Sequence, residues 1–171
     1  TGPEARADAH RLRAESDAIL VGAGTVRTDD PSLTVRDWPP PELHIDPAGV
    51  RDPRRVVLGS APADAKVHPC LEFDGAIPDL LDQLGGDDVV QLMVEGGPRV
   101  AHAFHHPRLV NEYVVYLAPA LFAGSDAASL FAGAGAMSIE GIWRGRFESV
   151  QQLGDDLRVV VLPGGADSAQ G

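Results

Sequence analysis

Two glycine-rich segments are the clearest places where this chain could bind a phosphate group. They run from Val21 to Thr25 (VGAGT) and from Val94 to Pro98 (VEGGP), and each follows an apolar run and precedes a helical pattern. Glycine lets the main chain approach a ligand closely, and the free amides and dipole of a helix start attract anions. Neither segment has Rossmann or P-loop spacing, so each could equally be a turn that only packs. Two such loops at neighbouring strand ends would favour a nucleotide site.

Arginines flank the first glycine segment and could bind phosphate. They are Arg11, Arg13, Arg27 and Arg36. A guanidinium group can hold phosphate through two parallel hydrogen bonds, although a solvated helix face is the commoner role of any single arginine.

Carboxylates near both segments are further candidates for ligand contacts. Asp29 and Asp30 could bind a ribose hydroxyl or begin a turn, and only one of them is expected to be functional. Glu95 follows an apolar strand directly and precedes two glycines. A carboxylate in such a place needs a partner, and a ligand with N–H donors would provide one.

Metal-ligating residue types are present, but their spacing does not predict a metal site. His102, His105 and His106 share a helical segment without an HExxH pattern or a nearby carboxylate, so a polar helix face is favoured over zinc. Cys70 is the only cysteine, which excludes an internal disulfide and any multi-cysteine metal site. We interpret it as a buried or idle thiol.

Alternating helices and strands must position these residues. Helices are expected at 4–15, with Thr1 as the N-cap, and at 77–84 and 98–106. Strands are expected at 17–22, 56–58, 89–94 and 110–118, followed by a hairpin of 147–153 and 157–162. The run 89–94 is almost continuously apolar, which is typical of a strand covered on both faces. This order predicts an α/β fold with the ligand at the carboxyl ends of the strands.

Length and composition predict one domain. We expect it to span 1–163, with a proline-rich loop at 38–53 and a flexible tail at 164–171. The net charge of −11 opposes binding to nucleic acid or to an anionic membrane. The longest uncharged stretch, 113–125, is shorter than the ~20 residues of a membrane helix, so a soluble, cytoplasmic protein is expected.

The segment from Ala5 to Arg36 closely resembles the reductase half of the bacterial bifunctional riboflavin deaminase-reductase. A second block, from Leu92 through Phe104 and on to Pro119, resembles the same family, and order and spacing agree over most of the chain. The resemblance implies a dihydrofolate-reductase-like fold with a mixed, mostly parallel sheet flanked by helices and a C-terminal antiparallel hairpin. It also implies NADPH as the cofactor and a homodimer.

The resemblance assigns site residues position by position. The cofactor-binding positions are Thr25, Asp29, Ser60 and the helix start Gly97, Pro98, Arg99, Val100, Ala101, His102 and Ala103. The substrate-binding positions are Arg13, Leu33, Arg36 and Glu95, the arginines suiting a ribose phosphate. It assigns no catalytic residue. NADPH is expected to be preferred over NADH, with Arg54 and Arg55 as candidates for the extra phosphate.

The implied reaction reduces the ribosyl group of 5-amino-6-(5-phosphoribosylamino)uracil to a ribityl group in riboflavin biosynthesis. The alternatives are a related NADPH-dependent reductase of a pterin or pyrimidine, and a non-catalytic nucleotide-binding or dimerisation domain. In the family, a first strand with a Ser-Leu-Asp-Gly-like turn and a Ser-x-Trp segment precede the position of Thr1. We expect that strand to be missing here, and the zinc-binding deaminase half is not in this sequence.

Overall fold

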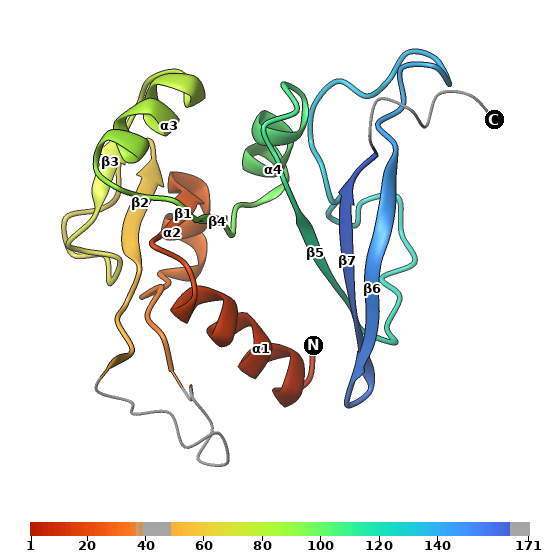
Figure 1. Cartoon of the computed structure of the whole chain (residues 1–171), viewed down its shortest axis with the longest axis horizontal. Helices are drawn as coiled ribbons and strands as arrows, with labels where there is room; N and C mark the ends of the chain where they lie inside the picture. Colours follow the sequence, from red (N-terminus) through yellow and green to blue (C-terminus); the bar gives the residue numbers. More distant parts are fainter. Residues whose placement is uncertain (37, 39–48, 165–171) are drawn as a thin grey trace.

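The computed structural model describes residues 1–36, 38 and 49–164, which form two β-sheets and their flanking helices (Figure 1). In chain order the elements are α1 (Pro3–Ala14), β1 (Ala18–Gly22), α2 (Ala23–Asp29), β2 (Arg54–Leu58), β3 (Leu71–Phe73), α3 (Ile77–Gly86), β4 (Leu92–Val94), α4 (Pro98–His105), β5 (Tyr113–Leu117), β6 (Gly145–Leu153) and β7 (Asp156–Pro163). Up to β5, strands alternate with helices except that β3 follows β2 without a helix between them, and the last three strands are antiparallel.

Strand β1 is the centre of a four-stranded parallel sheet with the order β3-β2-β1-β4. It pairs with β2 on one side and with β4 on the other. All five of its residues are buried. Because parallel strands cannot be joined by a tight turn, a helix or a longer segment connects each strand to the next.

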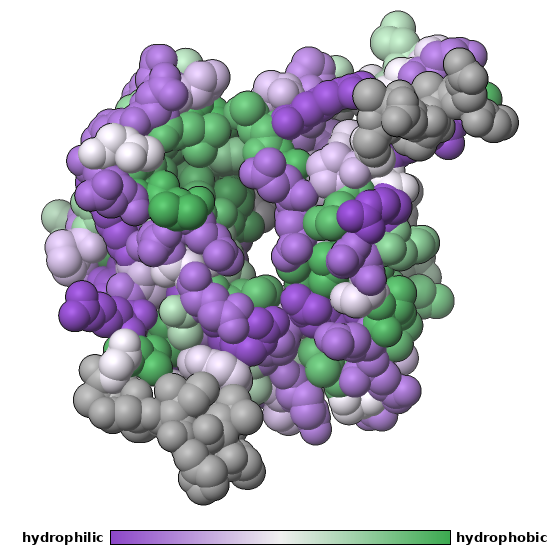
Figure 2. Space-filling view, viewed as in Figure 1, coloured by the Kyte–Doolittle hydropathy of each residue, from purple (hydrophilic) through white to green (hydrophobic). Residues whose placement is uncertain are grey.

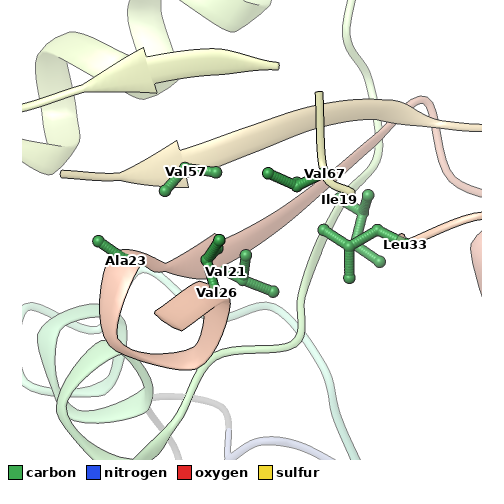
Figure 3. Close-up of a cluster of buried hydrophobic side chains, with 7 residues drawn as sticks. All are labelled: Ile19, Val21, Ala23, Val26, Leu33, Val57 and Val67. Atoms are coloured by element: carbon green, nitrogen blue, oxygen red, sulfur yellow. The ribbon is translucent and has the colours of Figure 1, made fainter. Parts of the chain in front are cut away.

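Two apolar clusters cover the opposite faces of this sheet. Ile19 and Val21 point to one face, where they pack with Val26 of α2 and with Leu33 (Figure 3). The alternate residues Ala18 and Leu20 point to the other face, which α3 and α4 cover. This period-two alternation places helices on both faces of β1, as expected for a parallel sheet.

The second sheet is antiparallel, with the strand order β5-β7-β6. Strands β6 and β7 form the hairpin, and Gly154 at its turn has a positive φ of 60°. The register shifts between Phe147 and Ser149, so that Phe147 and Val150 lie on the same face of the sheet. The other face of the sheet carries Tyr116 and Arg158, which contact α1.

Helix α1 lies between the two sheets and contacts both (Figure 1). The Asp8 carboxylate accepts a hydrogen bond from Tyr116 Oη at 2.6 Å and lies 2.9 Å from Nε of Arg158. Arg11 binds the same carboxylate at 2.7 Å. Just before the helix, the Gly2 amide donates to the buried Asp156 carboxylate at 2.6 Å. One end of the helix is therefore attached to β5 and β7.

An opening separates the two sheets. Strand β4 is an edge of the parallel sheet and β5 is an edge of the antiparallel sheet. Figure 2 shows a hole through the molecule in the region between these strands. Among the described residues, no β-pairing joins the two sheets.

Most of the sequence-based elements are confirmed, and the α/β fold class is confirmed. The C-terminal hairpin and the helix start at Pro98 lie where they were predicted. The strands divide between two sheets rather than forming the single mixed sheet expected. The expected loop 38–53 and tail 164–171 fall mostly outside the described residues.

Three local predictions were wrong or incomplete. The N-cap of α1 is Gly2 rather than Thr1, because Pro3 already has helical geometry. The predicted strand 89–94 shortens to Leu92–Val94, since the Asp17 carboxylate accepts hydrogen bonds from the amides of Val90 and Gln91. Val90 is 94% exposed, so the full run is not covered on both faces. Strand β3 was not predicted, being only three residues long.

No helix within the described ranges combines the length and apolar character that crossing a bilayer requires.

The Asp8 interactions predict how stability depends on this side chain and on pH. Asp8→Asn should lower the free energy of unfolding by roughly 1.5–3 kcal/mol, because charge-assisted hydrogen bonds are lost. Burial acts to raise the pKa of Asp8, but hydrogen bonds from Arg11 and Tyr116 and the charges of Arg11 and Arg158 lower it overall. The folded carboxyl thus binds its proton less tightly than the unfolded one. Its contribution is complete above pH ~4 and is lost as pH falls through the lower folded pKa.

Urea unfolding between neutral and acidic pH measures both effects. The variant should have a lower free energy of unfolding than the wild type at neutral pH. This free energy should also decrease less than that of the wild type as the pH is lowered into the acidic range. Asp82→Asn, an exposed carboxylate on α3, is the matched control and should change neither quantity. An unchanged midpoint in Asp8→Asn would show that α1 is held by other contacts.

Candidate functional site

The two glycine segments meet at the carboxyl ends of adjacent parallel strands. Strand β1 leads into α2, strand β4 leads through Glu95 to α4, and the two strands pair directly. A Cβ placed on Gly97 would lie 3.6 Å from Oγ1 of Thr25, so the second loop touches the first turn of α2. The prediction of loops at neighbouring strand ends is therefore confirmed.

The glycines in these loops have two different roles. A Cβ on Gly22 would approach Val100 Cγ2 to 2.8 Å, and one on Gly96 would approach Val100 Cβ to 2.4 Å. These two glycines are required because α4 packs closely on the strand ends. A Cβ on Gly97 would make an ordinary contact, and one on Gly24 would meet nothing within 4 Å. Gly24 and Gly97 therefore leave space in which a ligand could approach the backbone.

Helix α4 begins with its first amides uncapped by a side chain. Its N-cap is Gly97, and Pro98 occupies the first turn. The helix dipole and the free amides of such a start suit a phosphate group. The segment that follows β5 also contacts α4. The amide of Ala132 donates to the Pro98 carbonyl at 3.0 Å, and Gly133 lies against the His102 ring.

The remaining predicted residues of this helix differ in exposure. Arg99 is exposed, whereas Val100, Ala101, His102 and Ala103 are half-buried. Val100 is occupied in packing against Gly22 and Gly96. Any phosphate contact from this part of the chain is therefore expected from backbone amides rather than from these side chains.

Arg13 and Glu95 form a two-pronged ion pair beside the second loop. Nε of Arg13 lies 2.6 Å from Oε1 of Glu95, and Nη2 donates to Oε2 at 2.7 Å. Nη1 donates to the Thr34 carbonyl at 3.2 Å. The partner of Glu95 is therefore Arg13 of the same chain, whereas the sequence had suggested that a ligand would be its partner. The pair joins α1 to the carboxyl end of β4.

Leu33 and Arg36 lie on the segment that follows α2. Leu33 is only 2% exposed and packs in the core cluster with Ile19, with a positive φ of 54°. Its side chain is therefore unavailable to a ligand, and only its backbone could line a site. Arg36 is exposed, and its amide donates to Nδ1 of His10 at 3.1 Å. Of the predicted substrate positions, Arg36 presents its side chain to solvent most fully.

The structure distinguishes between Asp29 and Asp30. Asp30, the C-cap of α2, accepts a hydrogen bond from the Lys66 amide and pairs with Nζ of Lys66, both at 2.9 Å. These bonds, the backbone one first, lower the pKa of Asp30. Asp30 therefore stabilises a turn, and exposed Asp29 is left as the candidate for a ligand contact.

Ser60 is exposed just beyond the carboxyl end of β2, whereas Arg54 and Arg55 begin that strand. At ~3.3 Å per residue the strand alone separates them by over 10 Å. Arg54 pairs with Asp87, and Arg55 pairs with Asp52. These positions do not support the assignment of Arg54 and Arg55 to the extra phosphate of NADPH, which stays a prediction.

The histidines at the end of α4, His102, His105 and the C-cap His106, do not converge on one point. His105 contacts the Tyr113 hydroxyl at 2.8 Å and packs against Phe131 and Trp143. Burial, and then the charges of His102, His106 and Arg108, lower its pKa. The rings of His102 and His106 lie 5.5 Å apart. His105 thus belongs to an aromatic cluster that closes over α4.

This fold and its paired glycine loops define an α/β domain of the dihydrofolate-reductase-like class. Residues 1–159 match the RibD C-terminal domain family, and the chain belongs to that family. The riboflavin biosynthesis protein RibD of Mycobacterium tuberculosis H37Rv is 35% identical over 167 residues, covering 90% of this chain and 44% of the relative. RibD of Escherichia coli K12 is 31% identical over 191 residues, covering 92% and 52%. The chain spans about half the length of the curated relatives it matches.

Solved structures agree with this fold. Acinetobacter baumannii RibD, form 2, has a TM-score of 0.86 at 28% identity, covering 96% of this chain and 51% of that one. A diaminohydroxyphosphoribosylaminopyrimidine deaminase/5-amino-6-(5-phosphoribosylamino)uracil reductase from Thermotoga maritima has a TM-score of 0.72 at 20% identity, covering 95% and 50%. The second likeness concerns the fold alone.

The different roles of neighbouring glycines can be tested by adding a single methyl group. Gly96→Ala should lower the free energy of unfolding by about 1–3 kcal/mol, because its Cβ would overlap Val100. Gly97→Ala is the matched control and should cost much less, since the same atom has room there. Urea unfolding of both variants gives the comparison. Equal losses would mean that α4 shifts freely and that close packing does not explain Gly96.

Proposed function

We propose that this chain is an NADPH-dependent oxidoreductase domain that reduces the ribosyl group of 5-amino-6-(5-phosphoribosylamino)uracil to the ribityl group in riboflavin biosynthesis. The observation that carries the proposal is the meeting of Thr25 with the α4 helix start at the carboxyl ends of β1 and β4. Ligands of α/β sheets bind at such strand ends. Membership of the RibD C-terminal domain family supports the reaction.

The strand ends offer a suitable place for the cofactor. The α4 helix start has no side-chain cap and has space at Gly97, so its amides suit a pyrophosphate. In this proposal Thr25, Asp29 and Ser60 contact the rest of NADPH from the ends of the neighbouring strands. The preference for NADPH over NADH rests on the family alone, since Arg54 and Arg55 lie at the opposite end of β2.

On the substrate side, Arg36 and the Arg13–Glu95 pair have different roles. Arg36 is exposed and binds the ribose phosphate with its guanidinium group. Arg13 is already held by both oxygens of Glu95, so it orients that carboxylate and adds positive charge nearby. Leu33 lies on the same segment as Arg36, and it would contribute its backbone to the substrate site.

Bound NADPH supplies the hydride that is added to C1′ of the opened ribosyl group. The residues of this chain fix the geometry and balance the charge of both ligands. The Arg13–Glu95 pair holds α1 against the end of β4, so the substrate positions keep a fixed relation to the cofactor loops. We assign no general acid.

We also propose that the protein is a cytoplasmic homodimer. Leu117, Phe147, Val150 and Leu157 share one face of the antiparallel sheet and are 40–72% exposed. Figure 2 shows hydrophobic surface on the side of the molecule where β6 lies. An apolar sheet face of this kind is typical of a protein interface. A second copy would bury it.

A further strand between β4 and β5 is the remaining part of the proposal. Each is an edge strand, and they face the opening between the sheets. Unpaired edges readily accept another strand. The first strand of the family, which lies before the position of Thr1, would fit this role and would join the two sheets.

The role of Arg36 gives a kinetic test in the full protein that carries this domain. Arg36→Ala should lower kcat/KM for the phosphorylated substrate by roughly 10- to 150-fold, corresponding to the loss of a contact worth ~1.5–3 kcal/mol. The affinity for NADPH should be nearly unchanged. Arg36→Lys should recover only part of the loss, because an ammonium group lacks the planar fork.

Exposed Arg99, on the cofactor side, provides the matched control. Arg99→Ala should leave the KM for the phosphorylated substrate unaffected. Equal losses for phosphorylated and phosphate-free acceptors in Arg36→Ala would contradict the assigned role. Full activity on a pterin instead of the phosphoribosylamino-pyrimidine would contradict the proposed reaction.

The dimer proposal predicts an effect of charge on the exposed sheet face. Phe147→Glu combined with Val150→Glu should convert the protein to monomers, because carboxylates would have to be buried at the interface. Light scattering coupled to size exclusion measures the mass. Gln151→Glu, on the opposite face of β6, is the control and should leave the mass unchanged. A wild-type monomer, or a dimer that survives the double substitution, would exclude this interface.

A further inference from the structure

Three side chains with metal-binding atoms alternate along the segment that enters β3. His68, Cys70 and Glu72 are two residues apart, and only Glu72 lies within β3 itself. Leu71 and Phe73 pack with the core cluster on one face of the sheet, whereas Cys70 packs beside Ala61 and Ala65 against the cluster on the opposite face. Packing on both faces therefore fixes the position of Cys70. Among the described residues, these three form the one convergent group of histidine, cysteine and acidic side chains.

The distances between the donor atoms suit a tetrahedral metal ion. Sγ of Cys70 and Nδ1 of His68 are 3.5 Å apart. With Zn–S near 2.3 Å and Zn–N near 2.0–2.1 Å, a tetrahedral site would place these atoms roughly 3.6 Å apart. All three donor atoms lie within 4.8 Å of one another.

The loop after β2 supplies the hydrogen bonds that orient the candidate ligands. Nε2 of His68 lies 2.9 Å from the Pro62 carbonyl, which leaves Nδ1 as the atom facing Cys70 and Glu72. The amide of Ala61 donates to Oε1 of Glu72 at 2.9 Å. A histidine whose second nitrogen donates to a carbonyl, beside a hydrogen-bonded carboxylate, is the usual surrounding of protein metal ligands.

Solvent can reach the group, and the nearest cation is already paired. Cys70 lines an open surface pocket together with Pro69 and Arg55. Arg55 donates to the carbonyls of Val67 and His68 and pairs with Asp52 at 3.2 Å. Its guanidinium group is therefore directed to the backbone and to another carboxylate. Glu72 is itself exposed, so solvent also reaches the group from the Glu72 side.

We propose that His68, Cys70 and Glu72 bind a zinc-class divalent cation, with water as the fourth ligand. One nitrogen, one thiolate sulfur and one carboxylate oxygen are the donor types that zinc prefers. Binding replaces the thiol proton, which passes to solvent. The site shares no residue with the glycine loops, so it does not depend on the proposed reductase activity. It ties the start of β3 to the loop after β2.

Metal titration of the chelator-treated protein tests this site without an activity assay. Zn²⁺ should bind with one-to-one stoichiometry by calorimetry and should raise the melting temperature. Co²⁺ in place of Zn²⁺ should give a thiolate-to-metal charge-transfer band in the near ultraviolet. Cys70→Ser should abolish that band and weaken Zn²⁺ binding by roughly 100-fold or more, because even the outer partners of metal ligands contribute about 10- to 100-fold.

Two further variants and one control complete the test. His68→Gln and Glu72→Gln change surface side chains, so they keep the test valid if Cys70→Ser folds poorly, and each should weaken Zn²⁺ binding by at least ~10-fold. His106→Gln disrupts the rival His102–His106 pair and should leave the affinity unchanged. A cobalt complex without the thiolate band, or an affinity lost in His106→Gln but kept in Cys70→Ser, would overturn the proposal. Absence of saturable one-to-one binding would also overturn it.

Discussion

Burial of β1 on both faces is the constraint on which the rest of the structure depends. A strand with helices above and below it needs hydrogen-bonding partners on both edges for its buried backbone groups, and the parallel strands β2 and β4 provide them. The helices that cover it must then start close to its end. Val100 of α4 consequently lies so near the strand ends that only glycine fits at Gly22 and Gly96. The uncapped start of α4 lies directly beside this close packing, so the candidate phosphate site is positioned by the way the core is assembled.

The sequence predicted this part of the molecule well because its signals are local. Apolar alternation, a proline in the first turn of α4 and glycines at strand ends specify strands, a helix start and loops within a few residues. Sequence alone could not decide whether the glycines served packing or ligand binding. The structure shows that two neighbouring glycines have different roles, since Gly96 packs closely against α4 while Gly97 has space beside it. That distinction depends on Val100, whose position relative to both loops no local pattern specifies.

Charged side chains were harder to predict, because their partners lie far along the chain. Glu95 pairs with Arg13, 82 residues away, and Asp8 binds Tyr116, 108 residues away. Asp8 had no distinguishing sequence context, although it links α1 to the antiparallel sheet. The alternating His68, Cys70 and Glu72 did carry a signal, a period of two before a short strand. It was missed because β3 has only three residues and Cys70 was interpreted as a single idle thiol.

The central position of β1 also has a consequence for biosynthesis of the chain on the ribosome. The apolar segment Ala18–Gly22 is made before both of its partners, because β2 ends at Leu58 and β4 ends at Val94. At ~5–20 residues per second, β1 waits about 2–7 s for its first partner and roughly twice as long for its second. During this interval β1, whose five residues are all buried in the folded protein, has no native neighbour. Nascent chains stalled before Val94 should therefore recruit chaperones through β1.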